Sequence, residues 1–414
     1  MRSVHPRIDS SPHRTYLSNE NREGAMKLGA NLGFVVALSC VTAVIVFCAQ
    51  PEGQWKGSMT MDKNGVTIVR NPKEPLYRGN VISLEEELKI TGGEGEQAFR
   101  DLVSIAVDGD GRIYLLDGKA ANIKVCDRSG RFLKIVGRRG QGPGEFGRPE
   151  RLAITPHKEI MVSDPGRSLI HFLDMEGHYL RQLPQNSPFF SGPKFLSSGA
   201  MVASYSVFGE DFKTILCQLD KDMKPVFTYT TIPLYKPPKV HIFLYMFVYD
   251  LQWDIAPNDE VVWGAMTTPE YEIYVHDARG KIIRKIIKDY TPIDLTGDEY
   301  KKLMKAWFGR PPASGQFEFI VPREYPPFHT FMVDSEGRIF VRRFEAVDKG
   351  ERLLCEVFDS QGRYITDIVF PEKIIPMLFH DGRLYTREED EQGYLSVKRY
   401  KLKSLPGGKS DGLS

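Results

Sequence analysis

Short apolar runs, bounded by turns rich in aspartate and glycine, recur along most of the chain. The clearest copy spans residues 102–137 and reads LVSIAVDGDGRIYLLDGKAANIKVCDRSGRFLKIVG. It predicts four strands, at residues 103–107, 112–116, 122–126 and 131–136. Gly111 and Gly130 fall in the first and third predicted turns, where a tight hairpin needs a positive φ that glycine adopts without a Cβ clash. The pattern therefore predicts a four-stranded antiparallel meander.

Five further copies of this pattern follow along the chain. They span residues 151–183, 193–229, 251–287, 330–370 and 375–402, and the last has only three predicted strands. One such sheet cannot bury both of its faces, whereas copies stacked around an axis do so, and repeats of about 40–50 residues are typical of propellers. We therefore predict an all-β fold, a six-bladed β-propeller.

The incomplete last copy raises the question of how the ring closes. Residues 65–90, upstream of the first copy, contain the strand-like stretches VTIVR and VISLEEELKI. A propeller must close its ring or leave an exposed sheet edge. We therefore predict that an N-terminal strand completes the last blade, so that the propeller domain covers residues 65–403.

Four of the predicted third turns have the sequence Asp-x-x-Gly. They begin at Asp127, Asp174, Asp277 and Asp359. An aspartate at the first turn position can accept hydrogen bonds from backbone amides further along the turn, so a structural role explains these residues. The DGDG turn of Asp108 and Asp110 lacks further carboxylates at calcium-ligand spacing. We predict no metal site and no cofactor.

The N-terminal region has the pattern of an export signal or membrane anchor. Residues 28–47, LGANLGFVVALSCVTAVIVF, carry no charge and follow a basic stretch. About 20 apolar residues are just enough to span a bilayer as a helix. We divide this region into a basic tail (1–25), a signal peptide or hydrophobic anchor helix (26–48) and a linker (49–64); residues 404–414 are predicted to be a disordered tail.

Three interpretations of this region stay open. If translation starts at Met26, the segment resembles a bacterial lipoprotein signal with Cys48 as the lipidated residue, although Phe47 stands where that family has a small residue. Alternatively, the segment is a retained anchor or an ordinary cleaved signal. All three place residues 49–414 outside the cytoplasm, in the cell envelope on the periplasmic or extracellular side.

Charge and cysteine content exclude some partners. Lys and Arg total 55 and Asp and Glu total 54, so no global charge draws the chain to nucleic acid. The five cysteines form no CxxC or Cys/His cluster, which argues against a cysteine-based zinc site. Cys126 and Cys355 lie in predicted strands and are expected to be buried, inert thiols.

One stretch of the chain resembles a known family. Residues 105–117, IAVDGDGRIYLLD, are followed by DRSGRFL and by GQGPGEFGRP at 140–149. This combination resembles NHL repeats and, more narrowly, the six-bladed propellers that many bacteria export as lipoproteins; the match is strong over residues 95–185. The resemblance implies the fold, but such propellers act as protein-binding, carbohydrate-related or enzymatic scaffolds.

The long, varied loops are predicted to lie at one end of the strands. We call this end, formed by the middle loop of each blade and the connections between blades, the variable-loop face. Variable loops on a rigid scaffold commonly carry binding groups, and arginines with aromatics grip carboxylates, sugars or peptides. The candidate ligand-binding residues are Arg138, Arg139, Glu145, Asp164, Arg167, His241, Tyr249, Trp253, His329 and Arg342.

The insertion 291–328 has its own pattern. Thr296 is a plausible N-cap for a short helix near residues 298–307, and a proline-rich run follows. We expect this insertion to cover the variable-loop face as a lid; packing filler and a docking surface are the alternatives.

No catalytic motif of the common kinds is present: the chain lacks G-x-S-x-G, a phosphate loop and H-E-x-x-H. We therefore predict a membrane-attached, non-enzymatic binding scaffold for a protein, peptide or glycan. The alternative is a channel-centred enzyme, a metal-dependent lyase or a lactonase or other hydrolase, because a propeller can gather one histidine per blade at its axis.

Overall fold

The computed structural model describes residues 54–79, 81–185, 193–207, 213–233, 251–266, 270–298, 324–344, 352–371 and 374–404. Residues 52–414 form one compact unit. The predicted anchor helix, Cys48 and most of the predicted helix at 298–307 lie outside the described residues. Among the described residues, no helix is both long and apolar enough to cross a bilayer.

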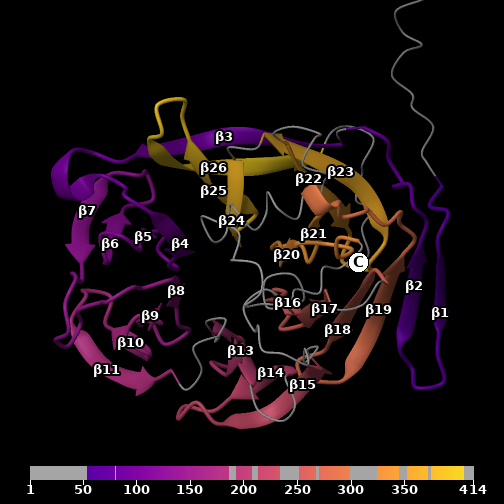
Figure 1. Cartoon of the computed structure of the whole chain (residues 1–414), viewed down its shortest axis with the longest axis horizontal. Helices are drawn as coiled ribbons and strands as arrows, with labels where there is room; N and C mark the ends of the chain where they lie inside the picture. Colours follow the sequence, from indigo (N-terminus) through magenta and orange to yellow (C-terminus); the bar gives the residue numbers. More distant parts are fainter. Residues whose placement is uncertain are drawn as a thin grey trace, which may run out of the picture. The chain divides into compact units, whose positions relative to one another are not determined.

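Six sheets surround a central axis, and the four strands of each blade are antiparallel (Figure 1). Blade 1 contains β4 (Leu102–Val107), β5 (Ile113–Asp117), β6 (Asn122–Cys126) and β7 (Phe132–Val136). Blade 2 contains β8 (Arg151–Ile154), β9 (Ile160–Asp164), β10 (Leu169–Leu173) and β11 (Tyr179–Pro184). Blade 3 contains β12 (Lys194–Phe195), β13 (Met201–Val207), β14 (Lys213–Leu219) and β15 (Pro225–Pro233).

The second half of the chain supplies the other three blades. Blade 4 contains β16 (Leu251–Ile255), β17 (Val261–Ala265), β18 (Glu272–His276) and β19 (Ile282–Lys288). Blade 5 contains β20 (Thr330–Val333), β21 (Ile339–Arg342), β22 (Arg352–Phe358) and β23 (Tyr364–Pro371). Blade 6 contains β24 (Ile374–His380), β25 (Arg383–Glu389) and β26 (Leu395–Ser404), and a short 3-10 helix, η1 (Gly95–Gln97), precedes blade 1. The predicted six-bladed propeller is confirmed.

An N-terminal strand completes blade 6, as predicted. Strand β3 (Ile82–Thr91) pairs antiparallel with β26, from Ser404 opposite Ile82 to Ser396 opposite Thr91 (Figure 1). Charges reinforce the pairing, because Glu87 Oε2 accepts from Arg383 at 2.7 Å and from Arg399 at 3.1 Å. The ring is therefore closed by the two ends of the propeller domain.

The N-terminal segment also extends the ring where the sequence did not indicate it. Strand β2 (Thr67–Asn71) pairs in parallel with β19 of blade 4, and β1 (Ser58–Met61) forms the outer edge. The amides of Leu76 and Tyr77 then donate to carbonyls of β23 in blade 5. Residues 58–91 thus form a belt along the outer edges of blades 4, 5 and 6, and the linker predicted at 49–64 contains a strand.

Asn71 fastens this belt to the blades. It is 3% exposed, and its Oδ1 accepts from the amide of Tyr364 at 2.7 Å and from Trp55 Nε1 at 3.1 Å. Its Nδ2 donates to the carbonyl of Gly362 at 2.9 Å. One buried amide side chain therefore joins the belt to the outer strand of blade 5.

The aspartate turns form as their sequence predicts. In the turns that begin at Asp127, Asp277 and Asp359, one carboxylate oxygen accepts the amides two and four residues further on. Gly111 and Gly130 have φ of 81° and 82°. These local bonds fix each hairpin independently of its neighbours.

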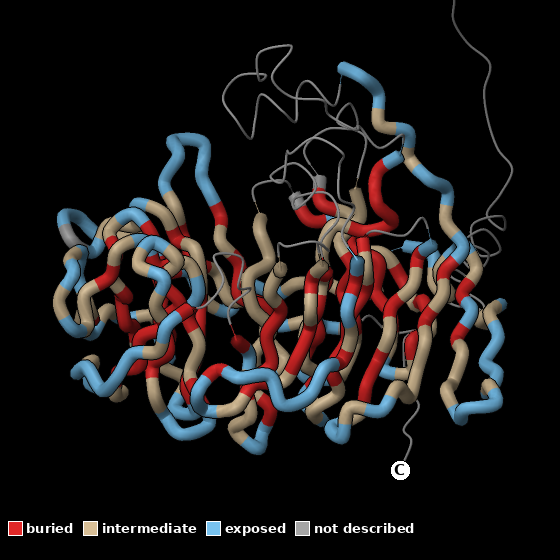
Figure 2. The backbone as a smooth tube through the Cα atoms, turned by 60° about the horizontal axis from the view of Figure 1, so that its bottom comes forward, coloured by how far each residue is buried: buried red, intermediate tan, exposed pale blue. Residues whose placement is uncertain are grey.

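The core is divided among the blade junctions. Six buried apolar clusters each combine side chains from two neighbouring blades, the last joining blades 6 and 1. Buried residues accordingly follow the strands, whereas the turns are exposed (Figure 2). Cys126, Cys217 and Cys355 are buried and free, and burial raises the pKa of Cys126 and Cys217 to about 11. The expectation of inert thiols at Cys126 and Cys355 fits these surroundings.

Two truncations of the N-terminal segment, one that removes β1 and β2 and one that also removes the closing strand β3, should have different effects on folding. A fragment of residues 52–414 contains every strand of the ring and should unfold cooperatively. A fragment that begins at residue 80 loses only the outer part of the belt and should melt at a lower temperature. A fragment that begins at residue 92 lacks β3, and we expect no cooperative thermal transition by circular dichroism. Equal melting of the last two fragments would show that β3 is not required for closure.

Replacement of Asn71 by alanine should lower the free energy of unfolding of the fragment of residues 52–414 by about 2–4 kcal/mol. The substitution leaves buried backbone groups of blade 5 without their partners, and each costs roughly 1–3 kcal/mol. Urea unfolding measures the change, with Lys63→Ala at an exposed turn position as the control. A loss below about 0.5 kcal/mol, the usual range for surface substitutions, would contradict the role of Asn71.

Candidate functional site

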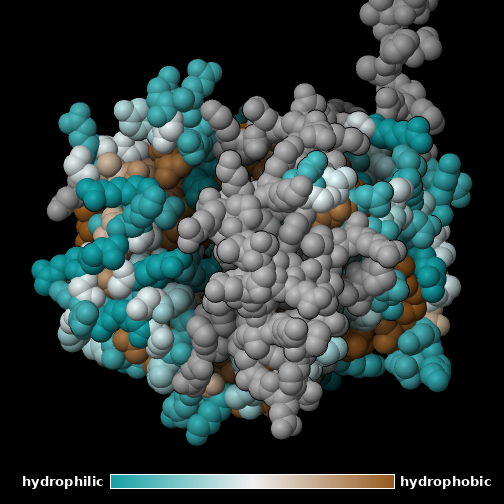
Figure 3. Space-filling view, in the orientation of Figure 1, coloured by the Kyte–Doolittle hydropathy of each residue, from teal (hydrophilic) through white to brown (hydrophobic). Residues whose placement is uncertain are grey.

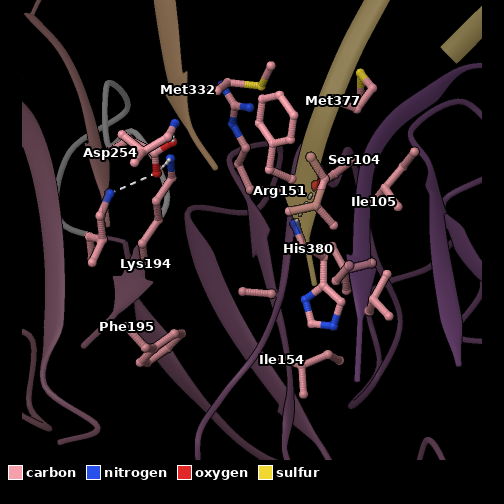
Figure 4. Close-up of a pocket in the computed structure, with 18 of the residues that line it drawn as sticks. Ser104, Ile105, Arg151, Ile154, Lys194, Phe195, Asp254, Met332, Met377 and His380 are labelled. Carbon is pink, nitrogen blue, oxygen red and sulfur yellow. Dashed lines mark hydrogen bonds and ion pairs between the residues drawn. The ribbon is translucent and has the colours of Figure 1, made fainter. Parts of the chain in front are cut away.

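A channel runs between the inner strands of the six blades. Its volume is about 1140 Å³, and residues of β4, β8, β12, β16, β20 and β24 line it (Figure 4). The first turns of the blades, including those at Asp108 and Asp259, line one end. The opposite end lies at the variable-loop face, where each inner strand begins.

Three blades are joined by one carboxylate on the channel wall. Asp254 Oδ1 on β16 lies 2.6 Å from Lys194 Nζ on β12, and Asp254 Oδ2 accepts from the amide of Val333 at 2.8 Å (Figure 4). Lys194 Nζ also lies 5.3 Å from the centre of the Trp253 ring. Both oxygens of Asp254 are therefore engaged, and the charge of Lys194 is balanced.

Arg151, the first residue of β8, also lies on the channel wall but, unlike Lys194, has no carboxylate partner among the described residues. Its side chain is exposed and lines the channel. It forms no ion pair or side-chain hydrogen bond with any residue in the described ranges. The variable-loop end of the channel therefore contains a guanidinium whose donors are open to an incoming group.

Apolar side chains share the channel with these charges. Ile154, Phe195, Met332 and Met377 are half-buried and line it from blades 2, 3, 5 and 6 (Figure 4). Two of them are methionines, whose flexible side chains adapt to irregular shapes. The wall thus offers both a charged contact and apolar area.

The first-turn end of the channel has its own polar groups, and these bond to one another. Arg112 lies 3.9 Å from carboxylate oxygens of both Asp108 and Asp110, and Tyr114 donates to Asp108 at 3.0 Å. Burial, together with the bond to Asp108, raises the pKa of Tyr114 to about 12. His380 lies at the same end, with Nε2 3.6 Å from Asp381.

The candidate residues of loop 137–150 bond mainly within the protein. Arg138 Nε donates to Glu145 Oε1 at 2.7 Å, and Glu145 Oε2 accepts the amide of Gly142 at 2.8 Å. The hydrogen bond from the Gly142 amide, together with the bond from Arg138, holds the pKa of Glu145 below its usual value. Arg139 donates to the carbonyls of Gly147 and Lys119. These contacts order the loop.

Arg167 and Asp164, from the middle loop of blade 2, complete the same arrangement. Arg167 donates to the carbonyls of Gln141, Gly142 and Glu145 at 2.6–3.2 Å. Asp164 is fully buried and accepts the amides of Gly147 at 2.6 Å and Arg148 at 2.8 Å. Burial opposes the charge of Asp164, but the neighbouring His171 ring and the bonds from these two amides keep its pKa below the usual value. Their binding role stays a prediction, while their structural role is explicit.

The position of Asp164, at the end of the second strand, is occupied by an ionisable residue in two other blades, and each has an ionisable partner on the next strand. Asp117 in blade 1 lies 3.1 Å from Lys124, and Asp164 in blade 2 lies 3.6 Å from His171. In blade 5 the polarity is reversed, because Arg343 lies 3.2 Å from Glu356. Lys288 of blade 4 contacts the same carboxylate at 3.1 Å. In blades 1 and 5 the same pair of positions therefore holds an ion pair, with the signs exchanged.

Trp253, His329 and Arg342 are the described candidates outside that network. Trp253 is a buried residue of β16, and its Nε1 donates to Ser204 at 3.1 Å. His329 donates its amide to the carbonyl of Arg342, and its ring centre lies 5.1 Å from that of Phe344. Arg342 lines the channel. Arg342 and Trp253 are thus brought together with Arg151 and Lys194 along one channel.

Other predicted features lie outside the described residues. These are His241 and Tyr249, the lipid-attachment candidate Cys48 and most of the insertion 291–328. The two ends of the insertion are described: Asp294 and Glu324 form an isolated bridge, and the amide of Tyr325 donates to the carbonyl of Ile293 at 2.8 Å.

Sequence reasoning missed Arg151, Lys194 and Asp254. A signal was available, because Arg151 and Lys194 stand at or next to the first residue of their repeat copies, where a propeller strand faces the axis. We sought binding residues in the variable loops and therefore did not consider the inner strands. Within the described parts of the chain, no group of three or more His, Cys, Asp or Glu residues could hold a metal ion.

Comparison with known proteins agrees with this architecture. Residues 99–193, which contain blades 1 and 2, match the model of a family described as "6-bladed beta-propeller" (DUF5128). The protein is a six-bladed β-propeller. No curated protein matches the chain at a significant level.

Several solved structures are similar to this propeller. A Bacteroides fragilis protein, described as a predicted exported protein, is 12% identical with a TM-score of 0.52; the match covers 81% of this chain and 99% of that one. A gluconolactonase from Xanthomonas campestris is 13% identical with a TM-score of 0.41, over 73% and 88% of the two chains. Virginiamycin B lyase from Staphylococcus aureus is 9% identical with a TM-score of 0.42, over 77% and 99%. At these identities the likeness concerns the fold alone.

Stability of the propeller should depend on pH through His329. Burial, and then the charge of Arg342, lower the pKa of His329 to about 4 from 6.5. The unfolded chain therefore binds a proton that the folded chain does not, so stability is full above about pH 6.5 and falls as the pH decreases toward 4. The difference corresponds to at most ~3 kcal/mol.

Urea unfolding of residues 52–414 at several pH values between 7.5 and 4.5 tests this dependence. The variant His329→Gln should unfold with a smaller loss of stability on acidification than the wild type. His157→Gln, at an exposed turn position, should keep the wild-type slope. If His329→Gln keeps that slope too, the histidine is not responsible.

Proposed function

We propose that this propeller is an exported binding protein that takes a ligand, such as a peptide or a glycan, into its central channel from the variable-loop face. The observation that carries the proposal is the channel, about 1140 Å³ in volume and lined by both charged and apolar side chains. Small-molecule sites commonly occupy about 300–1,000 Å³ and combine apolar walls with a few polar groups.

The channel is favoured over the outer loops as the binding site because the polar side chains of loop 137–150 bond within the protein. Arg138, Arg139, Glu145 and Arg167 bond to one another or to backbone groups of their loop. The described surface around the rim is mostly hydrophilic on the face seen in Figure 3. No observation in the described residues specifically favours the enzymatic alternative.

Export and membrane attachment form the second part of the proposal. The basic stretch and uncharged apolar run of residues 28–47 support it, and the similar Bacteroides fragilis protein is described as a predicted exported protein. We propose that Cys48 carries the lipid and that residues 49–414 lie outside the cytoplasm.

Binding in the channel can be tested with the neutral fluorescent dye N-phenyl-1-naphthylamine and the fragment 52–414. We expect saturable binding of one dye per propeller, with its fluorescence enhanced by the apolar wall. Ala153→Trp places a large ring among the channel residues and should abolish binding. Val226→Trp adds the same ring at a 59% exposed position on β15 and should leave binding unchanged. Equal binding by all three proteins, with thermal melts confirming that each is folded, would refute a channel site.

Attachment can be tested by mass spectrometry of the native protein from membranes. The proposal expects a chain that begins at Cys48 with a diacylglycerol mass on that residue, and Cys48→Ser should prevent this processing. An unmodified chain that begins at Met1 or Met26 would exclude lipidation and favour a retained helix.

A further inference from the structure

We propose that the channel ligand carries a single anionic group, a carboxylate or a sulfonate-like equivalent, that binds Arg151, and an apolar body that packs along the channel wall. This inference rests on the proposed function and adds to it the chemical class of the ligand. It follows from how the charges of the channel are distributed and used.

The state of Arg151 is the first step. An exposed arginine on a propeller rim is ordinary, but Arg151 belongs to an inner strand and lines the channel. The described residues offer its guanidinium no carboxylate, whereas the loop arginines Arg139 and Arg167 have carbonyl partners. A guanidinium presents a planar fork of donors that matches a carboxylate with two parallel hydrogen bonds.

The surrounding charges set the sign and size of the group. On the channel wall, Lys194 is balanced by Asp254, whose two oxygens are already engaged. Carboxylates at the first-turn end, Asp108 and Asp110, lie beside Arg112. A negative group near Arg151 therefore meets a guanidinium that has no carboxylate partner among the described residues, whereas the first-turn end contains carboxylates together with cations.

The apolar residues define the rest of the ligand. Ile154 follows Arg151 on the same strand, and Met332 and Met377 come from blades 5 and 6 (Figure 4). A small inorganic anion would leave this wall in contact with water. A ligand with one charge and an apolar body would satisfy Arg151 and bury apolar area along the channel at about 25 cal/mol per Å².

Two dyes that differ by one sulfonate test the inference. The anion 1-anilinonaphthalene-8-sulfonate and the neutral N-phenyl-1-naphthylamine share the same aromatic body. We expect fragment 52–414 to bind the anion more tightly than the neutral dye, and decanoate, but not decanol, to displace the anion. Arg151→Gln should weaken binding of the anion roughly tenfold to hundredfold, as loss of a charge-assisted hydrogen bond predicts, and should leave the neutral dye unaffected.

Matched variants separate charge from shape. Arg151→Lys keeps the charge and should retain part of the affinity for the anion. Lys158→Asn removes a cation from the opposite end of the channel, at a position with φ of 59° that asparagine tolerates, and should change neither dye. Equal affinity of Arg151→Gln and wild type for the anion would overturn the inference.

The outcomes distinguish this inference from the proposed function. If the neutral dye binds in the channel and the anion binds no more tightly, only the anionic group is wrong. If both dyes weaken equally in Arg151→Gln, the arginine acts through shape and the inference also fails. If neither dye responds to Ala153→Trp, the proposed function itself fails.

Discussion

Pairing of β3 with β26 is the contact on which the remainder of the propeller depends. It joins residues about 300 positions apart, since Arg383 and Glu87 are separated by 296 residues and Arg399 and Glu87 by 312. The channel exists only when this sheet is complete, because it requires blades 6 and 1 to pack as the other neighbours do. Burial opposes the charge of Glu87, yet Arg383 and Arg399 keep its pKa below the usual value, so the closing strand remains charged and paired. A closure of such long range carries a large loop-closure entropy, which the extended pairing must offset.

Within the blades, buried polar side chains hold neighbouring chain segments together over shorter distances. An acid at the end of the second strand in blades 1 and 2 holds the backbone of the segment that enters its blade, through Asp117 with the amide of Arg100 and through Asp164 with that of Arg148. The partner on the next strand compensates the buried charge, and blade 5 achieves this with Arg343 and Glu356 in reversed polarity. Breaking such a pair would leave an uncompensated buried charge, at a cost of about 3–5 kcal/mol. Asp164, which the sequence marks as a candidate binding residue, thus also has a structural role in its blade.

The sequence predicted what local chemistry determines. The aspartate turns, the blade number and the need for a closing strand all follow from spacing and turn residues, and the structure confirms them. The pairing of β2 with β19 could not be predicted, because VTIVR is apolar in the same way as any strand and its partner lies more than 200 residues away. The residues of the candidate site were harder to predict from the sequence than the fold. Arg139, Arg167 and Arg151 look alike in sequence, and only the folded loop shows that the first two donate to backbone carbonyls.

The arginines that donate to backbone carbonyls hold the loop at the channel rim in place, and Arg151 lies just beyond that loop. Because loop 137–150 is bonded through Arg138, Arg139 and Arg167, it holds the segment that leads into β8. Asp164 fixes the amides of Gly147 and Arg148, four and three residues before Arg151, so the backbone that carries Arg151 is held by a buried carboxylate. On the far wall, Asp254 holds Lys194 and the amide of Val333. Binding at Arg151 would then order little more than one side chain, and a site whose backbone is already fixed loses less entropy when its ligand arrives.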